Sequence, residues 1–195
     1  MKYYQYMNLV KQKVDHIDWK NINNKTLGIF SDADGNEYCI ILGVLRFSGN
    51  EAPYFRNFEK IRHLKCVNIG FGTYNSSNSS ASITTTGRNV PNTIFGMVQN
   101  AAFDKIDEMG INPELVAFSV SKKPTDNTPV EYDKRVKLYD KMANARWSKK
   151  FNYPLVYANI HGPLSNSVIM SKVDLSEEDL TDLQTYLYDS GQTLK

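Results

Sequence analysis

The chain has 195 residues, of which 41% are hydrophobic and 12% aromatic, and its formal net charge at pH 7 is +2. This length is typical of one domain that buries about two thirds of its unfolded surface, so no disulfide or metal is needed for stability. A charge so close to zero excludes an electrostatic argument for bulk nucleic-acid binding, although it is compatible with a local basic patch.

The cysteine content and hydropathy predict a soluble, intracellular protein. Cys39 and Cys66 form neither a disulfide framework nor a metal-binding pattern, and we interpret them as reduced, buried thiols. The N-terminal segment lacks the apolar core and cleavage site of a signal peptide. No stretch approaches the roughly 18 apolar residues of a membrane-spanning helix. Abundant Asn, Lys, Ile and Tyr, whose codons are AT-rich, suggest an AT-rich bacterial or phage genome.

The first elements along the chain are a helix and a hairpin. Residues 1 to about 18 carry apolar side chains at the spacing of an amphipathic helix. The segment TLGIFSDADGNEYCIILGVLRFSG predicts a hairpin, because two apolar runs flank turn residues. Asp32 and Asp34 also match the first two positions of a calcium loop, but Gly35 comes two residues too early and no Glu follows at the twelfth position. We interpret this segment as a turn.

An aromatic and basic segment, EAPYFRNFEKIRHLKCVNIGFGTY, follows and predicts a loop or short helix that leads into a strand. Its candidate contact residues are Phe55, Arg56, Phe58, Lys60, Arg62 and Lys65. They would suit nucleic acid or an acidic partner, and the alternative is a solvated basic face. The polar tract NSSNSSAS predicts the exposed tip of a hairpin that returns through SITTTG.

The second half alternates helices and strands. TIFGMVQNAAFDKIDEMG predicts a helix, PELVAFSVSK a buried strand, VEYDKRVKLYDKMANARWSKK a long helix and YPLVYANI another strand. A C-terminal helix is expected over about residues 175–190, because Ser176 and Asp179 resemble a capping box and Gly191 lies at a C-cap position. The order predicts an α+β fold with an α/β-like second half. We expect one mixed sheet flanked by helices, in a single domain over residues 1–195.

The motifs GRNVPNTIFGMV, VAFSV and RVKLYDKMA, in this order, are similar to the second half of the GNAT acetyltransferase superfamily. They also resemble uncharacterised tailed-bacteriophage proteins with a GNAT-like fold. The resemblance covers about residues 68–155. It implies a strand, then a glycine-rich loop and helix that hold the acyl-CoA pyrophosphate, then a strand and a helix with a Tyr near the thiol. The implied cofactor-binding positions are Gly87, Arg88, Asn89, Asn92 and Thr93, and the implied Tyr is Tyr139.

The chain departs from the enzymes' pattern in both motifs. The loop has one glycine, Gly87, and Pro91 removes a backbone N–H that a phosphate would need. In the second motif only Tyr139 matches. Its two open roles are protonation of a leaving thiolate and a packed position with a satisfied hydroxyl. For Arg135 the open roles are a structural tie to strand-end carbonyls or nearby acids, and anion capture together with Arg88.

Two other patterns give little support for catalysis or metal binding. His63 and Cys66 could form a nucleophile pair, but no third orienting group is identifiable, and we interpret them as a loop histidine and a strand cysteine. The three histidines lack metal-ligand spacing, so no metal site is expected.

These observations predict a bacteriophage protein with a degenerate acyl-CoA loop that needs no cofactor and acts by binding other proteins. We expect a virion-associated or oligomeric assembly component, in the host cytoplasm or the virion, without membrane contact. One alternative is an N-acetyltransferase that uses acetyl-CoA, with Tyr139 as general acid. Another is a protein that binds nucleic acid or a host factor. Cofactor binding separates the first two interpretations, and strong salt dependence would mark nucleic-acid binding.

Overall fold

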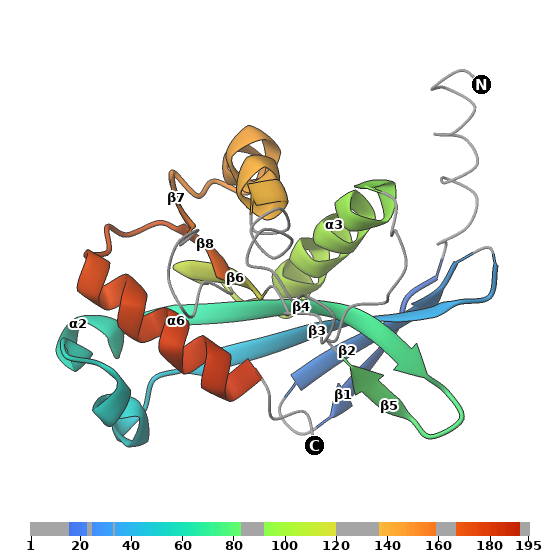
Figure 1. The fold of residues 1–195 in the computed structure, drawn as a ribbon, viewed down its shortest axis with the longest axis horizontal. Coiled ribbons are helices and arrows are strands. Elements are labelled where there is room, and N and C mark those ends of the chain that lie inside the picture. The colour runs from blue at the N-terminus through green and yellow to red at the C-terminus, as the bar shows by residue number, and fades with distance from the viewer. Residues whose placement is uncertain are drawn as a thin grey trace, which may run out of the picture.

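A single mixed β-sheet organises the part of the chain that the computed structural model describes, namely residues 16–22, 25–32, 34–82, 92–119, 137–158 and 167–191. Its eight strands are β1 (Asp18–Ile22), β2 (Lys25–Ser31), β3 (Glu37–Arg46), β4 (Lys65–Asn75), β5 (Ser80–Ser82), β6 (Leu115–Ser119), β7 (Leu155–Ala158) and β8 (Ser167–Ser171). Their order is β1-β2-β3-β4-β6-β8-β7, with β5 paired to β4 off this path. The expected α+β class with one mixed sheet is confirmed (Figure 1).

Strands β4 and β6 are parallel neighbours, whereas the other described pairs are antiparallel. The register of the parallel pair runs from Cys66↔Leu115 to Ile69↔Phe118. Beyond this point β4 continues and pairs with β5, beginning at Thr73↔Ser82. β4 therefore changes its partner close to the carboxyl end of β6.

Helices cover both faces of the sheet (Figure 1). One face carries α3 (Asn92–Glu108) and a helix that is described from residue 137, which continues through the π-helical turn η2 (Ala143–Trp147) into α5 (Ser148–Lys150). The other face carries α6 (Glu177–Gly191), beside the short helices η1 (Gly49–Tyr54) and α2 (Phe58–Ile61). Among the described helices, none is long and apolar enough to cross a membrane.

The apolar core lies in two layers because successive strand residues point to opposite faces. On the α3 face, strand residues such as Ile40, Val67 and Phe118 pack with Val98 and Trp147 from the helices. On the α6 face, the buried residues from strands and helices include Cys66, Leu115, Ala117, Ile169, Leu183 and Leu187. Strands β4, β6 and β8 are thus buried on both faces, which accounts for their continuous apolar runs.

Hydrogen bonds confirm two local predictions. In the turn between β2 and β3, the Asp32 carboxylate accepts the backbone N–H groups of Asp34 and Asn36 at 2.9 and 2.8 Å, and Gly35 has a φ of +79°. At the start of α6, the Asp179 N–H donates to Ser176 Oγ at 3.2 Å and the Ser176 N–H donates to Asp179 Oδ2 at 3.0 Å. The predicted turn and capping box are both present.

Two strands were not predicted. Residues 1–15 of the expected N-terminal helix lie outside the described residues, and the chain already forms β1 from Asp18. Three of the five residues of β1 are polar, so its pattern is weak. The apolar run of β8 is only three residues long, too short for a period to be read, yet β8 lies between β6 and β7 and is fully buried.

Candidate functional site

The carboxyl ends of β4 and β6 form the candidate ligand-binding edge, because ligands of open sheets bind where parallel strands end and the strand order changes. The C-terminal end of α3 connects to the start of β6. The N-terminal end of α3, at Asn92, is therefore the end nearer to the carboxyl end of β6. The helix described from residue 137 also begins toward this edge. It leads to the start of β7, and β7 runs in the same direction as β6.

The structure describes only part of the implied cofactor loop. Gly87, Arg88, Asn89 and Arg135 lie outside the described residues. Asn92 and Thr93 are the first residues of α3, and their side chains are not described. The roles assigned to these six positions stay predictions.

Tyr139 lies in the first described turn of the helix that precedes β7. Its side chain is partly buried and packs against the cluster on the α3 face, as does that of Met142 one turn later. Tyr139 therefore contributes to the apolar packing of this face. Both roles considered for its hydroxyl stay predictions.

Among the described residues, two buried side-chain oxygen atoms have no hydrogen-bond partner. Gln99 Oε1 belongs to α3, and Ser167 Oγ belongs to the first residue of β8, which pairs with Ser119 at the end of β6. A buried polar atom without a partner typically costs about 1–3 kcal/mol, so each calls for an explanation such as a water or a ligand. Neither atom was predicted as part of a site, although Gln99 interrupts the apolar stripe of its helix in the sequence.

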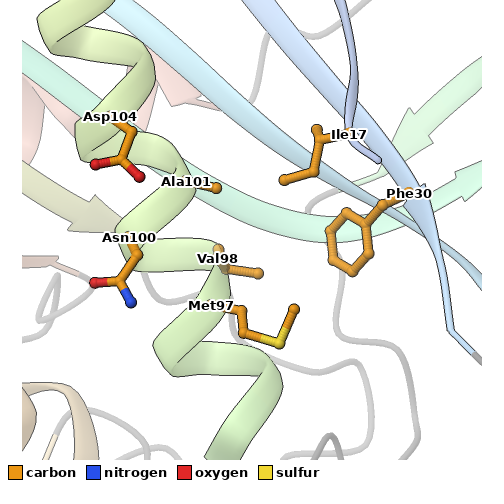
Figure 2. A pocket seen from close by; sticks show the side chains of 7 residues that line it. All are labelled: Ile17, Phe30, Met97, Val98, Asn100, Ala101 and Asp104. Atoms are coloured by element: carbon orange, nitrogen blue, oxygen red, sulfur yellow. The ribbon is translucent and has the colours of Figure 1, made fainter. Parts of the chain in front are cut away.

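A hollow of about 250 Å³ lies between α3, β2 and Ile17, the residue before β1 (Figure 2). Figure 2 shows Ile17 and Phe30 on one side and Met97, Val98 and Ala101 of α3 on the other. Asn100 and Asp104 complete the lining. The hollow is slightly smaller than the roughly 300–1,000 Å³ of ordinary ligand pockets, and it contains none of the predicted site residues.

The aromatic residues of the predicted contact surface belong to the interface with α6. The ring of Phe55 is buried, with centroid distances of 5.2 Å to Phe47 and 5.6 Å to Tyr186 of α6. Phe58 is partly buried in the same cluster. These rings are therefore core residues of the α6 face.

Three basic residues of this segment, Arg56, Lys60 and Arg62, are paired with acids. Arg56 Nη2 donates to Asp182 Oδ1 at 2.9 Å, and Lys60 Nζ donates to Asp179 Oδ2 at 2.6 Å. Arg62 Nε lies 3.0 Å from Glu59 Oε2. The segment consequently presents less free positive charge than its sequence suggests. A partner contact through the exposed side chains of Arg62 and Lys65 stays a prediction.

Asp179 is the most buried acid of this interface, with a side chain only 2% exposed. Burial alone would raise the pKa of its carboxyl, but the hydrogen bonds from Lys60 and Ser176 lower this pKa below its ordinary value. The carboxylate is therefore ionised at neutral pH and joins α2 to α6. Its role in the structure is an internal tie.

The pair of His63 and Cys66 is not arranged as a nucleophile and its base. Cys66 is fully buried in the α6-face cluster, and burial raises the pKa of its thiol to about 12. His63 accepts a hydrogen bond from Arg62 Nε at its Nε2 atom, at 3.1 Å. Both cysteines are buried and neither is in a disulfide, as predicted. Among the described residues, no cluster of His, Cys, Asp or Glu side chains could hold a metal ion.

Comparison with known proteins finds no match: no family model fits the chain, and no similar curated protein or solved structure was found. The sheet topology and the side-chain contacts above are therefore the basis for any functional argument.

Proposed function

We propose that the protein is a non-catalytic, GNAT-like domain of a tailed bacteriophage that acts by binding other proteins, as a virion-associated or assembly component. The element order supports the GNAT-like part of this proposal. A strand, a helix, a strand and the helix of Tyr139 occur in the order that the resemblance implies, with the hairpin of β4 and β5 before α3 and then β6. β4 and β6 are also parallel neighbours, as expected if a helix crosses between them.

The packing of Tyr139 is the observation that carries the non-catalytic part. In an acetyltransferase, this side chain would have to meet the thiol of a bound cofactor. Here its ring is partly buried against the α3-face cluster, which suits a packed position. Helix α3 begins directly after Pro91, whose nitrogen has no hydrogen to donate to a phosphate.

Acetyl-CoA binding tests this proposal. We expect the melting temperature of the wild-type protein to be unchanged by acetyl-CoA, and that of Tyr139→Phe to be equally insensitive. A dose-dependent rise in melting temperature for the wild type that Tyr139→Phe diminishes would overturn the non-catalytic interpretation.

An N-acetyltransferase is the second candidate, and the partnerless Oε1 atom of Gln99 favours it. A buried acceptor on α3 would suit an N–H group of a bound ligand. In this case the backbone N–H groups over residues 89–93 would receive the phosphates, and Tyr139 would protonate the thiolate.

The variant Gln99→Leu separates the two candidates, because Leu is apolar and of similar size. If Gln99 serves a ligand, Gln99→Leu lowers the affinity for acetyl-CoA. If it does not, Gln99→Leu leaves the response to acetyl-CoA unchanged.

A further inference from the structure

Strand β1 is an edge of the sheet, and no described strand pairs with its outer side. Asp18, Lys20 and Ile22 are exposed on one face of the strand, while Trp19 is partly buried on the α3 face. The outer side of an edge strand presents backbone N–H and C=O groups that can pair with another strand. In Figure 1, β1 lies beside β2, at the opposite end of the strand order from β8 and β7.

We propose that β1 binds β1 of a second copy of this chain, so that two sheets join into one. The two strands run antiparallel about a two-fold axis that passes between the two Trp19 residues. In this register Asp18 lies opposite the partner's Lys20, and Lys20 lies opposite the partner's Asp18. Such an interface is isologous, as in most homodimers.

In this register, each charged side chain of β1 lies opposite a side chain of opposite charge on the partner strand. Lys20 Nζ lies 2.8 Å from Asp18 Oδ2 within the chain, so both side chains point to the same face. Edge strands commonly resist pairing through like charges, especially lysines. Here the two charges are opposite, and antiparallel pairing creates two further pairs of opposite charge across the interface.

The same charges select one register. A shift by two residues in one direction would place Lys20 opposite the partner's Lys20, and a shift in the other direction would place Asp18 opposite the partner's Asp18. Like charges directly opposite one another are destabilising. The register centred on Trp19 avoids both of these like-charge pairs.

Trp19 adds an apolar contact at the two-fold axis. Its ring packs over Gly28 of β2, where a Cβ atom would lie only 2.7 Å from the ring, and Lys105 Nζ of α3 lies 5.7 Å from the ring centroid. The ring is therefore held in place beside β2, and the two Trp19 backbones exchange N–H and C=O hydrogen bonds at the two-fold axis of the proposed dimer. A cross-strand aromatic pair strengthens such an interface.

This inference goes beyond the proposed function and is independent of it. β2 and β3 separate β1 from β4, so the dimer interface and the candidate ligand-binding edge are different parts of the sheet. A monomeric protein that does not bind acetyl-CoA would overturn the dimer alone. A dimer that binds acetyl-CoA would overturn the proposed function alone.

Sedimentation velocity over a wide range of protein concentration tests the dimer. We expect wild-type protein to pass from monomer to dimer as its concentration rises. Lys20→Asp turns both cross-strand pairs of opposite charge into pairs of acids, and Asp18→Lys turns both into pairs of bases. Each variant should therefore weaken the dimer by about tenfold or more. The double variant Asp18→Lys/Lys20→Asp exchanges the charges and should restore the wild-type dissociation constant.

Two controls complete the experiment. Lys149→Asp changes the net charge by the same amount as Lys20→Asp, but at an exposed position on α5, and should leave the dimer unaffected. Thermal denaturation checks that every variant is folded, and the double variant provides the decisive comparison if a single variant is not. A wild-type protein that stays monomeric, a dimer insensitive to Lys20→Asp, or a folded double variant that fails to dimerise would each overturn the proposal.

Discussion

Removal of the Lys60 charge should destabilise the protein more than removal of the neighbouring Arg62 charge. Lys60 Nζ lies 2.6 Å from an oxygen of Asp179, whose side chain is 2% exposed, whereas Arg62 pairs with a Glu59 side chain that is 75% exposed. In Lys60→Met the aliphatic stem is kept and the cation is lost. The Asp179 carboxylate then stays buried with Ser176 as its only described hydrogen-bond partner.

The expected loss in free energy of unfolding follows from these contacts. A hydrogen bond to a charged group contributes about 1.5–3 kcal/mol, and a fully buried pair that loses one partner costs about 3–5 kcal/mol. The Lys60 side chain is 40% exposed, so solvent screens part of the interaction and we expect a loss of about 2–3 kcal/mol. For a chain of this size this corresponds to a fall in melting temperature of roughly 4–12 °C. For Arg62→Met, an exposed pair, the expected loss is below about 1 kcal/mol.

Chemical denaturation of both variants measures these losses, and its pH dependence tests their cause. The pKa of Asp179 is lowered in the folded protein, so its contribution to stability is present above the unfolded pKa of about 3.9 and is lost as the pH falls through the folded value. The difference between the wild type and Lys60→Met should therefore shrink on acidification, as Asp179 becomes protonated. Equal losses for Lys60→Met and Arg62→Met at neutral pH would refute this reasoning.

Three further predictions concern single sites. Cys66 is buried, and burial raises the pKa of its thiol to about 12. The thiol should therefore react with a thiol reagent at neutral pH only as fast as the protein opens, and prompt labelling of the native protein would contradict this. Gly28→Ala should cost about 1–3 kcal/mol because the new Cβ would lie 2.7 Å from the ring of Trp19 and 2.8 Å from Ile17 Cγ2, and an Ile17→Ala/Trp19→Ala background should remove most of this cost when measured by denaturation; an equal cost in both backgrounds would contradict this. Asp32→Asn should destabilise the protein at neutral pH but less in acid, since hydrogen bonds, including those from Asn36, lower the pKa of Asp32 even though burial alone would raise it; an equal loss at both pH values would count against this.

Local chemistry made several elements predictable from the sequence. The hairpin of β2 and β3 was predicted because Asp32 and Gly35 are turn residues, and the structure shows the expected hydrogen bonds and positive φ. Helix α6 was predicted from Ser176 and Asp179, which form the expected capping box. In each case the partners lie within a few residues of one another, so a short sequence pattern contains the whole interaction.

Contacts between distant parts of the chain were not predictable in this way. Lys60 and Asp179 are 119 positions apart, and the sequence of the aromatic and basic segment does not identify the acidic face of α6 as its partner. The pairing of β4 with β6 and the central position of β8 are likewise tertiary properties. Gln99 was overlooked because one polar residue in an apolar stripe does not change the prediction of a helix.

The most direct test of the central claim is a calorimetric titration of the purified protein with acetyl-CoA, with Tyr139→Phe measured in parallel. A non-catalytic domain that acts by protein binding predicts no saturable heat for either protein. Saturable one-to-one binding to the wild type, weakened in Tyr139→Phe, would contradict this claim and identify the domain as an acyl-CoA-dependent enzyme.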